Sequence, residues 1–368
     1  MAAFAAILVL CQEKQMNNKQ EMTYPLGTRP GDGEALEVCD GVLWVRMPIP
    51  FKGLDYINLY LIEDDDGWTM VDSGYNSEEI KTLWVQIFDK YLKGKPVTRL
   101  ICTHFHPDHM GLAGWVCEYW SIQLTMTFGE WTFGRMLYLE SGGEVPDHLI
   151  EFNKKVGFTE NMLNMVRKGG FSFFKNAVHN LPPSFIRIED GQEISISGNS
   201  WRVIVGKGHS QEHACLYCED KGVLISGDQV LPRITPHIGV YVSEPSANPL
   251  EKFLNSIDKL SSLPEETLVL PAHNDVFIGL HNQLIYYREH HAERLLRLKN
   301  ACGSPKTAFD LLPILFEREL SENNQRLAVA EGLAHCHYLV GTGELERITG
   351  ADGVWRFQIA QNVKTAVA

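Results

Sequence analysis

One short segment restricts what this chain can fold into more than any other: Thr103–His109, with the sequence THFHPDH. It places three histidines and one aspartate within six residues, directly after the apolar run VTRLIC. A short apolar run of this kind is typical of a buried strand, and the loop at its end can direct several side chains toward one point. The segment therefore predicts an α/β architecture whose chemistry lies at the end of a strand.

The chemical groups in this segment are those that bind metal ions. They are His104, His106, Asp108 and His109. Imidazole and carboxylate together suit zinc, and iron or manganese would also be accepted. One ion takes three or four protein ligands, and four groups this close together cannot all reach a single ion in good geometry. The segment therefore predicts two ions, which at about 3.5–4 Å apart can hold a bridging hydroxide.

Three further ligands are predicted, because each follows an apolar strand and would lie in a loop at the sheet edge. They are His209 after WRVIVGKG, Asp228 after VLISG and His273 after TLVLPA. The chain holds 14 histidines, and those without such a setting are predicted to lie in the core or on the surface. That group comprises His148, His179, His213, His237, His281, His290, His291, His335 and His337.

The remaining pattern supports strands and helices in one catalytic domain, residues 23–280. Two strands joined by a turn at Asp65–Gly67 are predicted within residues 37–71, and residues 77–92 have the spacing of an amphipathic helix. Residues 115–182 are rich in aromatic side chains and predict a helical insert that shapes a substrate pocket. Its candidate pocket residues are Trp131, Tyr138 and Phe171. The alternative, that these aromatics pack the insert against the body of the protein, stays open.

The two ends of the chain differ from this middle part. Residues 1–22 are predicted to be a leader without regular structure, since their apolar start falls short of the ~20 residues that span a bilayer. Residues 281–368 show three helical patterns and a hairpin signal, which predict a winged-helix-like domain. Eight scattered cysteines are predicted to be free thiols, which favours the cytoplasm.

The segment Thr103–His109 resembles the HxHxDH signature of the metallo-β-lactamase superfamily. Over about residues 37–280, the superfamily's other motifs are matched, in the same order, by Asp72 in VDSG, His209 in GHS, Asp228 in SGD and His273 in PAH. This resemblance implies an αβ/βα four-layer sandwich with two facing mixed sheets. The C-terminal domain resembles that of a subgroup with thioester hydrolases, lactamase-like proteins and a ribonuclease.

The resemblance also implies a role for each motif residue. The first metal would be held by His104, His106 and His209, and the second by Asp108, His109 and His273. Asp228 would bridge both ions, and Asp72 would fix a histidine or the loop. Asp108 or Asp228 would be the catalytic carboxylate that steers the hydroxide or carries a proton to the leaving group.

The predicted function is a binuclear metal-dependent hydrolase of a small-molecule ester or thioester, of the acyl-CoA or acyl-glutathione type. A formal charge of −13 argues against a nonspecific polyanion binder. Residues 281–368 hold ten Lys and Arg and ten Asp and Glu, so they show no basic excess for nucleic acid. The alternatives are a nuclease acting on RNA, a lactone hydrolase, or a noncatalytic protein whose C-terminal domain mediates interaction or homodimerisation. No membrane partner is predicted.

Overall fold

The structure is a computed structural model. It describes residues 22–50, 54–142, 144–169, 172–316, 320 and 322–361. The predicted leader lies outside these residues, except for Met22. Among the helices of the described ranges, none combines the length and the hydropathy that crossing a membrane requires.

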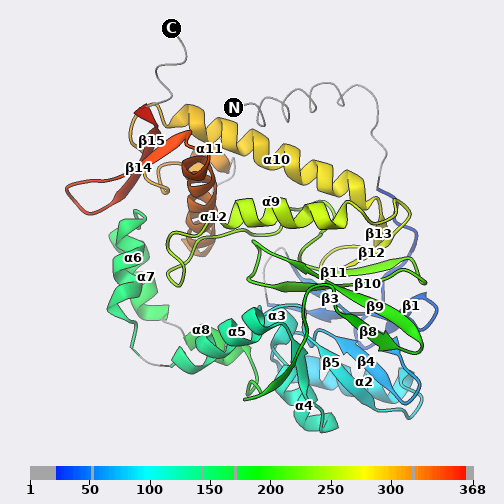
Figure 1. Ribbon diagram of the computed structural model, residues 1–368. Coiled ribbons are helices and arrows are strands. Elements are labelled where there is room, and N and C mark those ends of the chain that lie inside the picture. Colours follow the sequence, from blue (N-terminus) through cyan, green and yellow to red (C-terminus); the bar gives the residue numbers. More distant parts are fainter. Residues whose placement is uncertain are drawn as a thin grey trace.

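Two mixed sheets form the centre of the molecule (Figure 1). The first contains, side by side, β1 (Ala35–Cys39), β2 (Val42–Pro48), β3 (Tyr56–Glu63), β4 (Trp68–Val71), β5 (Val97–Ile101), β6 (Leu124–Met126) and β7 (Phe185–Arg187). The second contains β13 (Phe277–Ile278), β12 (Leu268–Pro271), β11 (Val223–Gly227), β10 (His213–Cys218), β9 (Asn199–Gly206) and β8 (Glu193–Ile196). In the first sheet the pairing is antiparallel from β1 to β4 and parallel from β4 to β7. The predicted turn at Asp65–Gly67 is confirmed, because β3 and β4 pair antiparallel across it.

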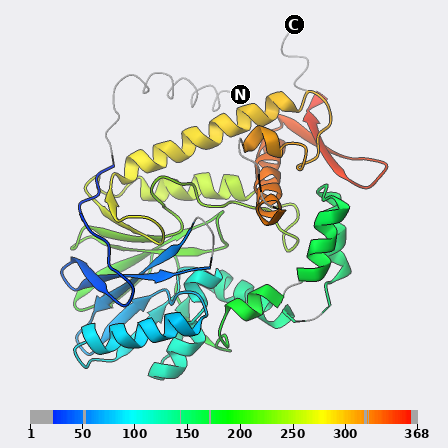
Figure 2. The ribbon, with the colours of Figure 1, turned by 180° about the vertical axis from the view of Figure 1, so that it is seen from behind.

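Helices cover the outer face of each sheet, and a third core lies between the sheets. Trp44, Tyr60 and Trp201 fill that inner core and are at most 2% exposed. The helices α2 (Glu78–Tyr91) and α4 (Ala113–Trp120) cover the first sheet, and α9 (Pro249–Leu260) and α10 (Leu280–Ala301) cover the second, as Figure 2 shows from behind. This order of layers confirms the predicted α/β fold.

The sequence of the helix α2 contains the signals that favour a helix at both ends and along its buried face. Ser77 caps the first turn, where its hydroxyl accepts a hydrogen bond from the Ile80 backbone N–H at 3.2 Å. Acidic residues occupy the first turn and Lys90 the last, which complements the helix dipole. The apolar side chains at helical spacing, including Ile80 and Trp84, are buried against the first sheet. The predicted helix at 77–92 is therefore confirmed to within one residue at each end.

The predicted helical insert begins later than residue 115. The helix α4 covers the first sheet, and β6 is a strand of that sheet between β5 and β7. Both elements therefore belong to the sandwich. A strand of three residues is too short to show periodicity, so its pattern could not separate it from the insert. The helical segment between β6 and β7 consists of α5 (Phe128–Glu140), α6 (Asp147–Lys155), α7 (Glu160–Gly169) and α8 (Ser172–Ala177).

The C-terminal region contains the predicted helices and hairpin. They are α10, the short α11 (Leu312–Leu315), α12 (Glu322–Gly341), β14 (Leu345–Thr349) and β15 (Trp355–Ile359). This region packs against the insert, where the rings of Phe152 in α6 and Trp355 in β15 lie 6.1 Å apart. Both views show α6 and α7 beside the hairpin (Figures 1 and 2). The winged-helix-like description and the exact domain boundaries stay predictions.

Candidate metal centre

The seven predicted ligands come together at one edge of the sandwich. His104 and His106 follow β5, and Asp108 and His109 lie in the short helix α3 (Pro107–Met110). The other three, His209, Asp228 and His273, follow β9, β11 and β12. Strands on both sheets therefore end where these loops meet, which is why residues far apart in sequence share one site.

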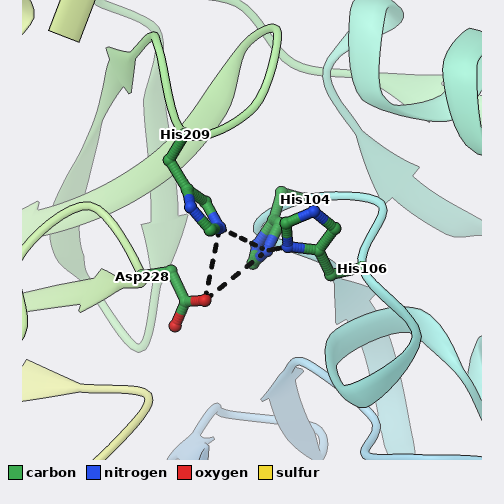
Figure 3. A group of neighbouring side chains, drawn as sticks. All are labelled: His104, His106, His209 and Asp228. Atoms are coloured by element: carbon green, nitrogen blue, oxygen red, sulfur yellow. Dashed lines mark hydrogen bonds and ion pairs between the residues drawn. The ribbon is translucent and has the colours of Figure 1, made fainter. Parts of the chain in front are cut away.

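The ligand atoms form two groups, and within each group all of them lie within 4.8 Å of one another. The first cluster consists of His104, His106, His209 and Asp228, which Figure 3 shows pointing toward one another. The second cluster consists of Asp108, His109 and His273. In the first cluster, His104 Nε2 lies 2.8 Å from His106 Nδ1 and 3.3 Å from His209 Nε2. Three ring nitrogens that face one point are the arrangement of a metal site.

Asp228 lies between the two clusters, and each of its oxygens faces a different one. Its Oδ2 lies 3.3 Å from His209 Nε2 in the first cluster. Its Oδ1 lies 3.5 Å from His109 Nε2 and 3.4 Å from His273 Nε2 in the second. This geometry supports the bridging role that the resemblance implied. Asp108 completes the second cluster, with Oδ2 at 3.4 Å from His273 Nε2.

Four of the five histidines have their other ring nitrogen anchored. The Nδ1 atoms face these partners: Thr103 Oγ1 at 3.0 Å from His104, Asp72 Oδ2 at 2.8 Å from His109, the His237 carbonyl at 2.8 Å from His209, and the Tyr56 carbonyl at 2.9 Å from His273. A histidine whose Nδ1–H donates to an oxygen presents a free lone pair at Nε2. The loops are thus held in the form that binds a metal.

Burial and nearby charges shift the histidine pKa values in opposite directions in the two clusters. Burial, followed by the nearby charge of His209, lowers the pKa of His106 to about 3, so its ring is neutral at pH 7. Burial also disfavours the charged form of His109, but the carboxylates of Asp72 and Asp228 outweigh it and raise its pKa well above the usual range. A metal in the second cluster would replace that proton, so its binding should weaken as the pH falls.

Three buried polar atoms of the ligand residues have no hydrogen-bond partner among the described residues, and a metal ion would satisfy them. His109 Nε2, His273 Nε2 and Asp228 Oδ1 are buried and make no hydrogen bond within the described part of the chain. Burying such groups without a partner costs several kcal/mol, and cations held among them would satisfy all three. The donor set of imidazoles and carboxylates therefore fits two divalent ions.

Asp72 contacts the ligand loop from behind, and the role that its motif implies stays a prediction. Its carboxylate accepts hydrogen bonds from the Thr103 backbone N–H at 2.7 Å and the Thr103 hydroxyl at 2.9 Å, besides its contact with His109. Asp72 has a φ of 61° and is 3% exposed. Aspartate tolerates this left-handed backbone better than most residues. Asp72 can therefore hold this backbone conformation and still contact Thr103 and His109.

His213, which the sequence pattern assigned to the core or the surface, is buried and supports the site. Its Nε2 accepts a hydrogen bond from the Asp228 backbone N–H at 3.0 Å. Gly227, just before, has a φ of 50°, and a Cβ there would lie 2.5 Å from His213 Nε2. Only glycine therefore allows this approach. The signal that could have found His213 is its position at the start of the strand that follows the His209 loop.

A buried carboxylate that sequence reasoning missed joins two ligand loops. Glu130, in the first turn of α5, is fully buried and accepts hydrogen bonds from the Phe105 backbone N–H at 3.0 Å and from Ser210 Oγ at 2.7 Å. It also accepts from the Glu212 backbone N–H at 2.5 Å. In return, the Glu212 side chain accepts from the Gly129 N–H at 2.7 Å. This reciprocal pair ties the insert to the loops that carry His104, His106 and His209.

Replacing Glu130 by glutamine is expected to weaken metal binding at the first cluster by about 10- to 100-fold. Glutamine has the same shape but only one accepting oxygen, so one of the three donors would face an N–H group. Metal affinity, measured by competition with a chelator, checks this, while circular dichroism confirms the fold. Glu118→Gln on the exposed face of α4 is the matched control. Unchanged affinity in Glu130→Gln would show that the pair does not position the ligands.

The C-terminal helices also reach the site. The His237 carbonyl that holds His209 belongs to a residue whose Nδ1 lies 3.6 Å from Glu331 Oε2 in α12. Glu331 in turn pairs with Arg294 in α10. The sequence pattern predicts His237 only in the core or on the surface, because its sequence neighbours do not indicate that its backbone lies next to a ligand.

Of the three candidate pocket residues, two lie in the described part of the chain, and both make packing contacts. Trp131 stacks on Phe185, with ring centroids 4.6 Å apart, and donates a hydrogen bond to the Pro182 carbonyl. Tyr138 packs at the margin of the core beneath the first sheet. These contacts agree with the packing alternative, and a role in a pocket stays a prediction for both. Phe171 lies outside the described residues.

Known proteins resemble this chain over most of its length. Residues 53–273 match the Metallo-beta-lactamase superfamily, and residues 295–360 match the Metallo-beta-lactamase-like, C-terminal domain. The crystal structure of a beta-lactamase domain protein from Burkholderia ambifaria is 41% identical, covers 92% of this chain and 98% of that chain, and has a TM-score of 0.85.

Two similar proteins have names that state an activity. The probable metallo-hydrolase YqjP of Bacillus subtilis (strain 168) is 26% identical over 302 residues, which are 76% of this chain and 88% of that protein. The atrochrysone carboxyl ACP thioesterase AgnL7 of Paecilomyces divaricatus is 25% identical over 187 residues, which are 48% of this chain and 54% of that protein. The superfamily match spans more than half of the chain and agrees with the site geometry, so this protein belongs to the metallo-beta-lactamase superfamily.

Proposed function

We propose that this metal-dependent hydrolase holds two zinc ions and cleaves small-molecule thioesters of the acyl-CoA or acyl-glutathione type. The observation that carries the proposal is Asp228, whose two oxygens face different clusters. A carboxylate in this position can be shared by two ions, and two-metal sites serve hydrolysis. The similarity to a protein named as an ACP thioesterase supports the choice of a thioester.

Zinc is proposed because of the ligands. The first cluster offers three imidazoles and a carboxylate, a set that suits tetrahedral zinc. Hydrolysis of a thioester needs no change of oxidation state. Iron or manganese would be accepted by the same nitrogen and oxygen ligands, so metal analysis of the purified protein decides between them.

When bound, such ions would polarise the scissile carbonyl and lower the pKa of a bound water. The residues of the chain then have two tasks. Asp108 and Asp228 are both directed at His273, and one of these two carboxylates orients the attacking water and accepts its proton. The leaving thiolate makes little demand on a general acid, because a thiol has an ordinary pKa of about 8.5. A thioester therefore requires less from a general acid in the site than an amide would.

The test is thiol release from a panel of acyl-CoA and acyl-glutathione thioesters by the metal-loaded protein. Release is expected from at least one thioester, to disappear with a chelator and to return when zinc is added back. The preferred acyl group would then be read from the ratios of kcat/KM across the panel.

The same panel can defeat the proposal. If the protein retains two ions per chain and releases thiol from none of the thioesters, the thioester assignment is wrong. Lactones, phosphodiesters and RNA would then be assayed with the same loaded protein. A salt-sensitive gel shift with RNA would favour the nuclease alternative.

A further inference from the structure

Three arginines from separate segments gather beside the second cluster around a single carboxylate. Arg29 precedes β1, Arg46 lies in β2, and Arg233 lies in the loop after Asp228. Asp275 accepts two hydrogen bonds from Arg29, one of them at 2.6 Å, and lies 3.7 Å from Arg233 Nη2. In a chain with a formal charge of −13, three guanidinium groups near the two carboxylates of Asp275 and Asp32 are a local excess of positive charge.

This arginine group lies next to a metal ligand. The Arg46 guanidinium carbon lies 4.1 Å from the centre of the Tyr56 ring, and the Tyr56 carbonyl accepts from His273 Nδ1 at 2.9 Å. Asp275 follows His273 by two residues. Asn58, which pairs with Arg46 across β2 and β3, donates to the carbonyl of Asn274 at 2.8 Å. The strand β3, which pairs with the strand β2 that presents Arg46, is therefore bonded directly to the His273 loop.

Arg46 feels the charges of Asp275 and Asp32 only at longer range. No carboxylate within the described ranges lies at ion-pair distance from its guanidinium, which stacks on the face of the Tyr56 ring. The side chain is half-buried, and burial, followed by repulsion from Arg29, lowers the pKa of Arg46. A charged group that has lost part of its hydration without forming an ion pair is destabilised, and a bound anion would supply a closer counter-charge.

The group is also accessible from solvent. The side chains of Arg29 and Arg233 are 47% and 55% exposed. Arg233 holds a φ of 69°, a left-handed backbone that is unfavourable for a residue with a Cβ. The Arg233 ring contact with Tyr24, at 4.5 Å from the guanidinium carbon to the ring centre, helps to hold it there. The planar fork of a guanidinium matches a carboxylate or a phosphate with two parallel hydrogen bonds.

We propose that Arg46, flanked by Arg29 and Arg233, binds an oxyanion group of the substrate, a carboxylate or a phosphate, beside the second cluster. This inference rests on the proposed function, because it assigns a charged arm to the thioester. Glutathione carries carboxylates and coenzyme A carries phosphates, so both thiols offer the same chemistry to the arginines. A thioester of a neutral thiol would lack that contact.

The test compares three non-hydrolysable thioethers on the zinc-loaded full chain by isothermal titration calorimetry. S-hexylglutathione and S-hexyl-coenzyme A carry the two oxyanions, and S-hexyl-N-acetylcysteamine carries none. At least one anionic thioether is expected to bind more tightly than the neutral one, with the difference shrinking as salt is added. Arg46→Gln should weaken the anionic thioether by about 10- to 100-fold and leave the neutral one unchanged.

Two further variants make the result specific. Arg202→Gln is the matched control, because Arg202 also stacks on a tyrosine, Tyr217, on the other sheet. It should leave all three affinities unchanged. Arg46→Lys retains the charge without the planar fork and should give an intermediate loss, which guards against a folding defect in Arg46→Gln.

The outcomes separate this inference from the proposed function. Preference for the glutathione or the coenzyme A thioether identifies a carboxylate or a phosphate as the anion. Equal affinity for anionic and neutral thioethers, binding of none of the three, or an Arg46→Gln variant that keeps the preference would overturn the arginine site. Thiol release is measured separately, so a failure of thioester hydrolysis beside a clear anion preference would defeat only the proposed reaction.

Discussion

Replacing Asp228 by asparagine is expected to lower turnover by about 1,000-fold and to reduce the metal content below two ions per chain. The reason is the charge that both clusters share. Two unit charges 4 Å apart interact by about 4 kcal/mol at an effective dielectric constant of 20, so two divalent ions would repel each other by roughly 16 kcal/mol. The carboxylate of Asp228, with one oxygen toward each cluster, offsets that repulsion, and a neutral amide does not.

The measurements are metal content by mass spectrometry and turnover of the thioester that the panel identifies. Asp40→Asn is the matched control, because Asp40 is fully exposed and its loss removes one negative charge away from the site. It should retain both ions and full turnover. An Asp228→Asn variant with two ions and the turnover of the wild type would show that the carboxylate does not bridge.

The ligands could be predicted from the sequence because each one follows a local signal. His209, Asp228 and His273 stand just beyond apolar runs, and such runs become buried strands whose ends meet at the sheet edge. Local pattern and three-dimensional position agree in these cases. The same agreement explains why the helix at 77–92 and the turn at Asp65–Gly67 were predicted close to their observed bounds.

The supporting residues could not be predicted, because their roles depend on segments that approach only in the fold. Glu130 is a single acidic residue in FGEWTFGR, and nothing nearby in sequence indicates that it meets Phe105 and Ser210. Arg46 lies at a partly buried position of a mostly apolar strand, and nothing in that pattern marks it as a binding residue. Its proximity to Arg29 and to the His273 loop arises from sheet pairing and from the path of the N-terminal segment.

Substrate choice is the least predictable property for the same reason. Aromatic residues in the insert suggested a pocket, but Trp131 uses its ring and its indole N–H to pack against Phe185 and Pro182. Composition alone cannot distinguish an aromatic ring that packs from one that binds. The arginines beside the second cluster are charged, separated in sequence and grouped in space, so they are the stronger guide to the substrate.

Replacing Asp108 by alanine is expected to lower turnover by about 1,000-fold while leaving one ion bound. Asp108 makes its ion-pair contacts in the second cluster, at 3.4 Å from His273 Nε2 and 3.8 Å from His109 Nε2. The three histidines of the first cluster keep their geometry, because Asp72, Glu130 and the His237 carbonyl anchor their loops from the other side. The fold should therefore survive, and metal loss should be confined to the second ion.

The contrast between the two variants tests the two-cluster geometry itself. Asp108→Ala should titrate with one tightly held ion, whereas Asp228→Asn should weaken both ions, because only Asp228 faces both clusters. Asp89→Ala, an exposed aspartate in α2, controls for loss of an acidic side chain within a helix. A folded Asp108→Ala variant with full turnover would refute two-metal hydrolysis. If both variants lost both ions equally, Asp108 and Asp228 would belong to a single coupled site rather than to two clusters joined by one carboxylate.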